Sequence, residues 1–330
     1  MPKGGLDVIA VGNAIVDVIA RVDDAFIEAN GAPKGGMTLI DAGQAKAVYD
    51  RMGPAQESSG GSAANTAAGI ASFGGRAGFV GRVRNDQLGQ IFTHDIRAVG
   101  VSYETPHADH GMRTARCFIF VTPDAQRTMM TFLGASTEIA PEDVAPEIVE
   151  KAAVLYIEGY LWDAGPAKAA VLKAIDAARA AGAKVAFTLS DSFCVERHRA
   201  EFRELIRDHI DILFANEAEI TALCETEDFD AAADMIAPDV EVAALTRSEK
   251  GSVVAHGDER IAVKAEQPAR VVDTTGAGDL YAAGFLYGYA KGRAFADCAR
   301  LGGVAAAEVI SHFGARPERS LAELAERAGL

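Results

Sequence analysis

The hydrophobic positions of this 330-residue chain follow two different patterns. In the first, from residue 60 onward, apolar runs bounded by turn residues alternate with alanine-rich stretches such as AGPAKAAVLKAIDAARAAG, whose apolar positions recur every three or four residues. This alternation predicts an α/β fold, with a mostly parallel central sheet between two layers of helices. The expected strands read RAGFVGRV, AAVLYIEGY, AKVAFTLS, IDILFAN, VEVAALTR and GSVVAHG, and ARVV at 269–272 looks like the end of another strand.

The second pattern consists of short strand-like runs with no helix between the members of each pair: AIVDVIARVD with GGMTLID, and TARCFIFVTP with QRTMMTFLG. These runs predict a small separate β-sheet that covers a site as a lid. We therefore expect a large α/β domain made of residues 1–12, 42–100 and 134–330, and a lid made of residues 13–41 and 101–133.

Composition narrows the possible partners. The content of 49% hydrophobic residues supports a large folded core, and the net charge of −15 disfavours binding to nucleic acid or to an anionic membrane. No apolar run reaches the roughly 18 residues of a membrane span. The four cysteines are far apart and form no C-x-x-C pair, so neither a zinc site nor a disulfide framework is expected, and a cytoplasmic location fits best.

The sequence DTTGAGD at 273–279 stands where an apolar helix begins. Glycines let the amides of Gly276, Ala277 and Gly278 face an anion at the positive end of the helix, and Asp279 could take a proton from a hydroxyl. A plain helix cap, with Thr274 or Thr275 as the capping residue, explains the same residues equally well at this stage.

Two further segments offer polar groups to a ligand. In SSGGSAANTAAGIASFGG, Gly61 and Ser62 precede a helix whose small residues indicate close packing, while Asn65 lies in its first turn and could meet a ligand hydroxyl. Asp17 interrupts the apolar run AIVDVIARV, with Asn13 four residues before it. A buried carboxylate there needs hydrogen-bond donors, such as two adjacent sugar hydroxyls, although a solvent-facing aspartate on an edge strand is an equal alternative.

Asn216 and Glu219 follow the strand IDILFAN, at the edge of the sheet where open α/β sheets bind ligands. They could hold Mg²⁺ through water, but helix capping by Asn216 is the more common use of such a residue. His107 and His110 form a pair in a polar loop without a third ligand, which favours a solvated loop over a metal site. No phosphate-binding G-x-x-x-x-G-K-[ST] motif is present.

GGSAANTAAGIASFGG, NEAE and DTTGAGDLYAAGF together, in this order, resemble the signatures of the PfkB or ribokinase family of sugar and nucleoside kinases. The resemblance implies a ribokinase-like fold with a β-sheet lid, ATP and Mg²⁺ as cofactors and possible dependence on K⁺. It implies Asp279 as the base, the amides at 276–278 as the anion hole, and Asn216 and Glu219 as residues that bind Mg²⁺ through water. Further residues that it suggests for the nucleotide and its phosphates are Asn216, Thr246, Arg247, Gly251, Thr274 and Gly314.

Within the family, GNAIVDVIARVD, GGSAANT and DILFANEAE are most similar to adenosine kinases. This similarity implies transfer of phosphate from ATP to adenosine, as in purine salvage. The residues expected around the substrate are Asn13, Asp17, Gly61, Ser62 and Asn65 at the sugar, and Met37, Leu39, Tyr160 and Trp162 around the base. The alternatives are a ribokinase- or fructokinase-like enzyme and a nucleotide-binding regulator without activity. Monomer and homodimer remain equally open.

Overall fold

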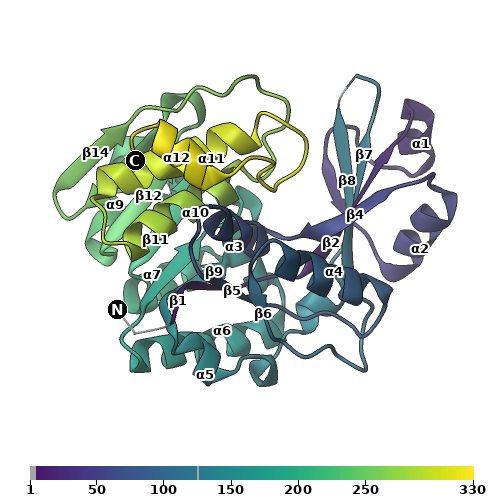
Figure 1. The fold of residues 1–330 in the computed structure, drawn as a ribbon, viewed down its shortest axis with the longest axis horizontal. Coiled ribbons are helices and arrows are strands. Elements are labelled where there is room, and N and C mark those ends of the chain that lie inside the picture. The colour runs from purple at the N-terminus through teal and green to yellow at the C-terminus, as the bar shows by residue number, and fades with distance from the viewer. Residues whose placement is uncertain (1–4, 125) are drawn as a thin grey trace.

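The computed structural model describes residues 5–124 and 126–330, which form a large α/β unit and a smaller β unit (Figure 1). Within this described part, the large sheet has nine strands in the order β14-β13-β12-β11-β10-β9-β1-β5-β6. All neighbouring strands are parallel except the pairs made by β13 and β14 at one edge. Their bounds are β1 (Leu6–Val11), β5 (Ala77–Val80), β6 (Ser102–Tyr103), β9 (Ala152–Glu158), β10 (Lys184–Thr188), β11 (Ile212–Asn216), β12 (Val242–Thr246), β13 (Ser252–His256) and β14 (Glu259–Val263).

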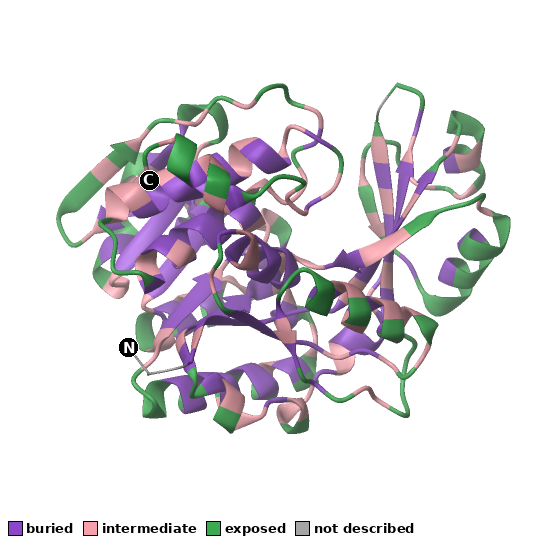
Figure 2. Cartoon of the chain, viewed as in Figure 1, coloured by how far each residue is buried: buried purple, intermediate pink, exposed green. Residues whose placement is uncertain are grey.

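Helices cover both faces of this sheet, so the predicted three-layer arrangement is confirmed. Side chains of Val8, Val154 and Phe214 point into one core, which is shared with α3 (Ser62–Ser72), α4 (Gln87–Ala98), α10 (Ala277–Ala290), α11 (Phe295–Val309) and α12 (Leu321–Arg327). Alternate strand residues such as Leu155 and Phe187 point into the opposite core, which is shared with α5 (Pro146–Val149), α6 (Gly165–Ala180), α7 (Ser192–His209), α8 (Glu217–Cys224) and α9 (Phe229–Ile236). Figure 2 shows buried residues through the central strands of the large sheet, whereas the edge strand β14 is exposed or intermediate.

Close contact between helices explains most of the small residues in the sequence. A Cβ atom at Gly69 of α3 would lie 2.6 Å from the Cβ of Ala283 in α10, and one at Gly302 of α11 would lie 2.7 Å from the carbonyl oxygen of Tyr281. The alanines and glycines of these helices therefore allow α3, α10 and α11 to pack tightly, as the packing interpretation of these residues expects.

The small unit is a sheet with strand order β3-β8-β7-β2-β4. Its bounds are β2 (Ile15–Arg21), β3 (Met37–Leu39), β4 (Gln56–Gly60), β7 (Ala115–Val121) and β8 (Arg127–Phe132). Helices α1 (Asp24–Ala29) and α2 (Ala42–Arg51) cover one face, where Val16, Val18, Phe118 and Phe120 are buried. The opposite face, which we call the inner face, carries Asp17, and it is the subject of the next section.

Several local expectations differ from the structure. No helix was expected between AIVDVIARVD and GGMTLID, but α1 lies between β2 and β3. Strand β4 falls within residues 42–100 but belongs to the small sheet, and β6 falls within 101–133 but belongs to the large one. The interpretation of ARVV as a strand is wrong, because residues 269–272 form no strand. The last antiparallel strand is instead β14, which the sequence did not reveal because its side chains are largely exposed and polar.

Candidate active site

The DTTGAGD segment forms a tight turn that leads into α10. Gly276 is the N-cap residue, with a left-handed φ of 79°, and a Cβ there would lie 2.7 Å from the Cβ of Ala315. Glycine is therefore required by both conformation and space. Gly278 faces open space instead. The amide of Ala277 donates to the carbonyl of Thr274 over 3.2 Å, whereas in the described part of the chain the amides of Gly276, Gly278 and Asp279 have no partner.

Asp279 lies in the first turn of α10 and faces the start of α3. Its Oδ1 accepts a hydrogen bond from Ser62 Oγ (2.6 Å), and its Oδ2 accepts one from Asn65 Nδ2 (3.0 Å). Burial raises the pKa of Asp279, while the bonds from Ser62 and Asn65 and the charge of Arg316 lower it. The structure thus brings together residues that lie more than 200 positions apart in the chain, and they orient the carboxylate that the sequence proposed as a base.

Arg316 also belongs to this cluster, and the sequence analysis missed it. Its Nε donates to Asn65 Oδ1 (2.8 Å) and its Nη2 to Ser59 Oγ (3.0 Å), while Nη1 is buried without a hydrogen-bond partner. Burial lowers the pKa of Arg316 to about 10, and the nearby carboxylates, including those of Asp17 and Asp279, oppose that shift. A guanidinium with one unused buried donor is suited to an anion. No local pattern around residue 316 marks it, because the loop reaches the site only in the folded protein.

Glu158, at the C-terminal end of β9, is a second residue that was missed. It is fully buried; its Oε1 accepts from the Asn13 backbone amide (2.8 Å) and from Asn13 Nδ2 (2.6 Å), and its Oε2 accepts from the amide of Ala63 (2.9 Å). Burial raises the pKa of Glu158 to about 7. Asn13 is thereby fixed beside the start of α3. The sequence could have indicated Glu158, because this glutamate ends the apolar run AAVLYIE at the edge of the sheet where ligands bind.

Asp17 lies on β2, which pairs with β4 on one side and with β7 on the other. The alternative of an edge strand is therefore wrong. Burial raises the pKa of Asp17 to about 6, and the charges of Arg316 and Arg127 oppose this shift. Among the described residues, no group donates a hydrogen bond to its carboxylate. Both carboxylate oxygens are thus available to hydroxyl donors of a ligand.

The glycine pair before α3 brings backbone close to these residues. A Cβ at Gly60 would overlap the carboxylate of Asp17, and one at Gly61, whose φ is 101°, would overlap the carbonyl oxygen of Asn13. Gly60 and Gly61 are therefore needed because backbone packs closely against Asp17 and Asn13 here, and the expected contact of Gly61 with a ligand stays a prediction.

The inner face of the small sheet is largely apolar. Strand register aligns Met37, Met129, Ile119 and Ile19 in one row and Leu39, Thr131, Cys117 and Asp17 in the next. Met37 is 50% exposed and Leu39 is 57% exposed, which leaves an uncovered apolar surface in the row of Asp17 and in the row beside it. The positions expected for contact with a base therefore share a face with Asp17.

The two aromatic residues expected near a base lie on the large unit. The hydroxyl of Tyr160 donates to the carbonyl of Ser190 (3.3 Å), and its ring is partly exposed. Trp162 is 5% exposed, packs edge-on against Phe187 and Phe202, and donates from Nε1 to Glu201 (2.9 Å). The interpretation of Trp162 as a base contact is therefore wrong, because its indole fills the core of the large unit.

An ion pair joins the small unit to the DTTGAGD turn. Arg127 of β8 pairs with the carboxylate of Asp273 and donates to Thr275 Oγ1 over 3.4 Å. Asp273 also accepts from the amide of Thr275 (3.0 Å) and from the amide of Gly314 (3.1 Å). Asp273 thus organises the turn, and no strand ends at this residue.

Two of the residues expected around the nucleotide, Asn216 and Thr246, end β11 and β12 and are register partners. Asn216 and Glu219 form a capping box: Asn216 Oδ1 accepts from the Glu219 amide (2.9 Å), and Asn216 Nδ2 donates to Glu219 Oε1 (2.6 Å). Burial raises the pKa of Glu219 to about 7. Asn216 therefore caps α8, as the alternative interpretation expected. If Asn216 and Glu219 also bind Mg²⁺, they would do so through water molecules.

The other expected nucleotide residues differ in their surroundings. Arg247 pairs with Glu217 (2.7 Å) and lies over the Phe229 ring at 4.0 Å, so its guanidinium is already engaged. Gly251, with a φ of 90°, forms the turn between β12 and β13, where a side chain would overlap the Val263 carbonyl. Thr274 is exposed, and Gly314, with a φ of 97°, has open space beside it.

Among the described residues, Asp163, Cys194 and His198 make the one group spaced like metal ligands. Arg197 donates to both oxygens of Asp163 (3.0 and 2.7 Å), and burial raises the pKa of Cys194 to about 12. This group is thus engaged with protein partners and lacks a ready thiolate. His107 is hydrogen-bonded to Thr93 over 2.7 Å rather than placed with other ligands.

A model of the pfkB family of carbohydrate kinases matches residues 7–320. The chain belongs to the pfkB family. It is similar to the structure of an adenosine kinase from Sinorhizobium meliloti, with 56% identity, a TM-score of 0.91, and coverage of 98% of this chain and 100% of that one. A probable sugar kinase from Rhizobium etli CFN 42 is 52% identical, with a TM-score of 0.92 over 100% of this chain and 99% of that one. Fructokinase-1 of Oryza sativa subsp. japonica is 30% identical over 235 residues, which are 69% of this chain and 72% of that protein.

The expected family, ribokinase-like fold and kinase activity are thereby confirmed: this pfkB kinase is a sugar or nucleoside kinase. Kinases of this family generally use ATP with Mg²⁺. Across residues 5–124 and 126–330, no helix has both the length and the apolar character needed to cross a membrane.

Proposed function

We propose that this kinase phosphorylates the 5′-hydroxyl of a nucleoside, with adenosine as the preferred substrate. The observation that carries the proposal is the inner face of the small sheet, where the exposed apolar side chains of Met37 and Leu39 lie one row or less from the unpaired carboxylate of Asp17. A nucleoside has both features that this surface would recognise, namely a planar apolar base and a ribose diol. The 56% identity to a protein named adenosine kinase supports the same choice.

In this proposal, Asp17 binds the two ribose hydroxyls, while Asn13, Gly61, Ser62 and Asn65 limit the space around the sugar. The carboxylate of Asp279 accepts the proton of the attacking hydroxyl, and its bonds from Ser62 and Asn65 keep it in place. Charge that develops on the transferring phosphoryl group is stabilised by the unpartnered amides of Gly276, Gly278 and Asp279. Because the Ala277 amide donates to Thr274, its part in the anion hole requires that bond to open.

The site also fits the triphosphate of ATP. The open space at Gly278, the positive end of α10 and the unused Nη1 of Arg316 form a cradle for phosphate oxygens. Asn216 and Glu219 would hold Mg²⁺ through water, with Thr246, Arg247, Gly251, Thr274 and Gly314 around the nucleotide and K⁺ as a further proposed cofactor. When bound, Mg-ATP supplies the phosphoryl group and neutralises part of its charge.

Replacement of the base tests the chemical step. We expect Asp279→Asn to lower kcat by about 10²–10⁴-fold, the usual contribution of a general base. Asn keeps acceptor and donor atoms for Ser62 and Asn65, so the thermal unfolding temperature serves as the folding control. Near-normal turnover in a folded Asp279→Asn protein would show that the base is assigned wrongly.

Substrate choice is tested with adenosine, inosine, guanosine, ribose and fructose in an ATP-dependent assay. We expect the highest kcat/KM with adenosine, and we expect Asp17→Ala to raise the KM for adenosine more than the KM for ATP. The relation to fructokinase-1 makes a free-sugar kinase the second candidate, and preference for fructose or ribose would establish it. Binding of ATP without turnover of any of the five would favour a regulator that has lost activity.

A further inference from the structure

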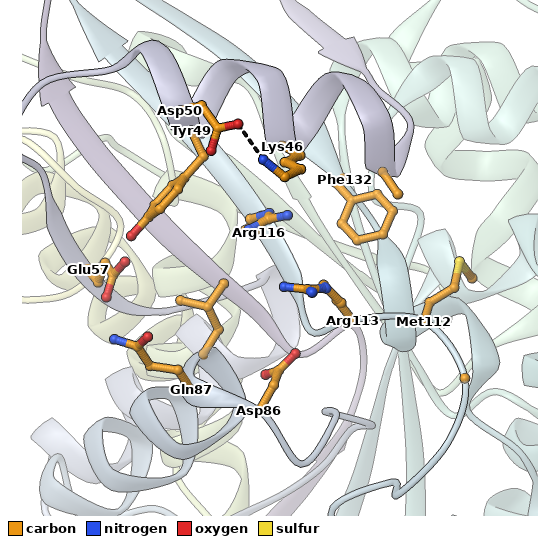
Figure 3. A pocket seen from close by; sticks show the side chains of 13 residues that line it. Lys46, Tyr49, Asp50, Glu57, Asp86, Gln87, Met112, Arg113, Arg116 and Phe132 are labelled. Atoms are coloured by element: carbon orange, nitrogen blue, oxygen red, sulfur yellow. Dashed lines mark hydrogen bonds and ion pairs between the residues drawn. The ribbon is translucent and has the colours of Figure 1, made fainter.

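Figure 3 shows a cavity lined by Arg116 and Phe132, whose positions along β7 and β8 place them on the face of the small sheet opposite Asp17. Its volume is about 510 Å³, within the range of small-ligand sites. Helix α2 supplies Lys46, Tyr49 and Asp50, strands β4, β7 and β8 supply Glu57, Arg116 and Phe132, and residues 86–88 and 111–113 close the other side. The cavity is therefore bounded both by the small unit and by the start of α4 in the large unit.

Two arginines occupy the middle of this cavity (Figure 3). Arg116 is half-buried beside the rings of Tyr49, Phe118 and Phe132, at 5.6 to 5.9 Å from their centroids, and its Nε is buried without a hydrogen-bond partner. Arg113 is exposed into the same space. Within residues 5–124 and 126–330, neither guanidinium forms an ion pair with a carboxylate. Burial and the positive charge of Arg113 lower the pKa of Arg116, and the negative charges of Asp86 and Glu57 oppose this shift.

Among the described residues, no carboxylate that lines the cavity forms an ion pair with these arginines, although Asp86 and Glu57 act on Arg116 through their charge. Asp50 pairs with Lys46. Asp86 is used as the cap of α4, since it accepts from the amides of Gly89 (2.9 Å) and Thr114 (3.0 Å) and from Thr114 Oγ1 (2.6 Å). Two arginines that face one cavity without an ion pair to a carboxylate can bind an external anion.

We propose that this cavity binds a phosphorylated sugar, with its phosphate between Arg113 and Arg116 and its hydroxyls toward Glu57 and Gln87. The fork of a guanidinium matches phosphate oxygens in pairs. Glu57 is half-buried and has no partner among the described residues, so its carboxylate is available to accept hydroxyl donors. A free sugar phosphate and a nucleoside monophosphate share this chemistry, and the exposed face of Tyr49 offers a stacking surface to a base.

The position of the cavity also gives its occupant an influence on the small unit. Arg116 precedes Cys117, which is the register partner of Asp17 on β2. A ligand that contacts both α2 and the start of α4 restricts movement between the small and the large unit. We therefore assign the cavity as an effector site, and this assignment does not depend on which substrate is phosphorylated at Asp279.

The cavity can be monitored without measuring activity. All four native cysteines are buried, so a cysteine introduced by Met112→Cys, at a lining position that is 40% exposed, can be labelled selectively with a small trifluoromethyl group. Titration with ribose 5-phosphate, AMP and inorganic phosphate is followed by the ¹⁹F resonance of this label. A label at Leu172→Cys on α6, where the side chain is 43% exposed, reports changes unrelated to the cavity.

We expect ribose 5-phosphate to shift the Met112→Cys resonance saturably, to leave the Leu172→Cys resonance unchanged, and to bind more tightly than inorganic phosphate. Loss of one charged hydrogen-bonding partner by Arg113→Gln or Arg116→Gln should weaken binding by about 10- to 100-fold. Arg51→Ala, on α2 but outside the cavity, is the matched control and should bind normally, as should Asp17→Asn. Tighter binding of AMP than of ribose 5-phosphate would identify a nucleotide as the effector.

The proposal is overturned if neither phosphorylated sugar gives a saturable shift at millimolar concentration. It is also overturned if Arg113→Gln, which alters an exposed side chain and should fold normally, binds as the unaltered protein does. Loss of the response in Asp17→Asn would place the ligand in the site at Asp17 and would likewise refute it. Equal affinity for inorganic phosphate and ribose 5-phosphate would refute the contacts to Glu57 and Gln87.

Discussion

The buried carboxylate of Glu158 provides a strong test of how the site is held together. Its two oxygens accept three N–H groups, two from Asn13 and one from Ala63, at 2.6 to 2.9 Å. Replacement by glutamine keeps the shape but substitutes an NH₂ group for one oxygen. If the amide oxygen faces Asn13, the NH₂ group faces the Ala63 N–H, and one buried donor loses its acceptor. At pH 5, where Glu158 of the unaltered protein is protonated, this should lower the free energy of unfolding by about 1–3 kcal/mol.

The stability of the unaltered protein should itself depend on pH, because Glu158 can gain or lose a proton. Burial raises the pKa of Glu158 from 4.5 to about 7. Between these two pH values, Glu158 is protonated in the folded protein and ionised in the unfolded chain. The stabilisation is complete below pH 4.5 and is lost as the pH rises through 7. The difference between the two pKa values corresponds to about 3 kcal/mol. Glu158→Gln cannot titrate, so it should be clearly less stable than the unaltered protein at pH 5 and nearly equal to it at pH 8.5.

Urea denaturation followed by tryptophan fluorescence between pH 5 and 8.5 measures both effects. Asp17, with its pKa raised to about 6, and Glu219, with its pKa raised to about 7, contribute a similar slope in both proteins, so the comparison isolates Glu158. Glu104→Gln, which changes an exposed carboxylate, serves as the control and should keep the original slope. An identical dependence on pH in Glu158→Gln and in the unaltered protein would refute the reasoning.

Three further predictions concern the backbone, the ion pair and the thiols. Gly61→Ala should lose more unfolding free energy than Gly74→Ala in urea, because both have positive φ, which costs about 1–3 kcal/mol, but only Gly61 would also overlap Asn13; equal losses would contradict this. Arg127→Met should speed amide hydrogen exchange in β8 and in the turn at 273–276, because it removes the ion pair to Asp273; unchanged exchange would show that this pair does not hold the units together. Burial raises the pKa of Cys117 to about 12, so iodoacetamide at pH 8 should modify it only after unfolding in urea, and rapid labelling of the folded protein would contradict this.

The sequence predicted the elements whose patterns are set locally. Strands such as AAVLYIEGY and VEVAALTR are buried on both faces, so their apolar runs mark them clearly, and β9 and β12 are found within these segments. Strand β14 was not predicted, and the segment at 269–272 was wrongly predicted as a strand, because apolar content does not follow strand structure at these two places. An exposed edge strand needs few apolar residues, and a loop that packs on the fold can contain several.

The residues of the candidate site likewise include some that local sequence motifs identify and others that they do not. DTTGAGD, GGSAANT and NEAE could be recognised because a turn that faces an anion and a helix start that faces a ligand need particular residues at fixed spacing. Trp162 was assigned wrongly, since an aromatic residue near a strand end fits a pocket and a core equally well. Only the packing of Phe187 and Phe202 against the indole shows that Trp162 belongs to the core.

The sequence by itself thus determined the family, the order of the layers and the position of Asp279, because each depends on a contiguous run of residues. The tertiary structure alone decided which distant groups complete the site, namely Glu158 behind Asn13, Arg316 beside Asn65 and Arg127 against Asp273. It also decided that Arg113 and Arg116 share a cavity with α2 and the start of α4. These contacts join residues up to 251 positions apart, and no local pattern records them because the pKa and the partners of a buried charge depend on what folds against it.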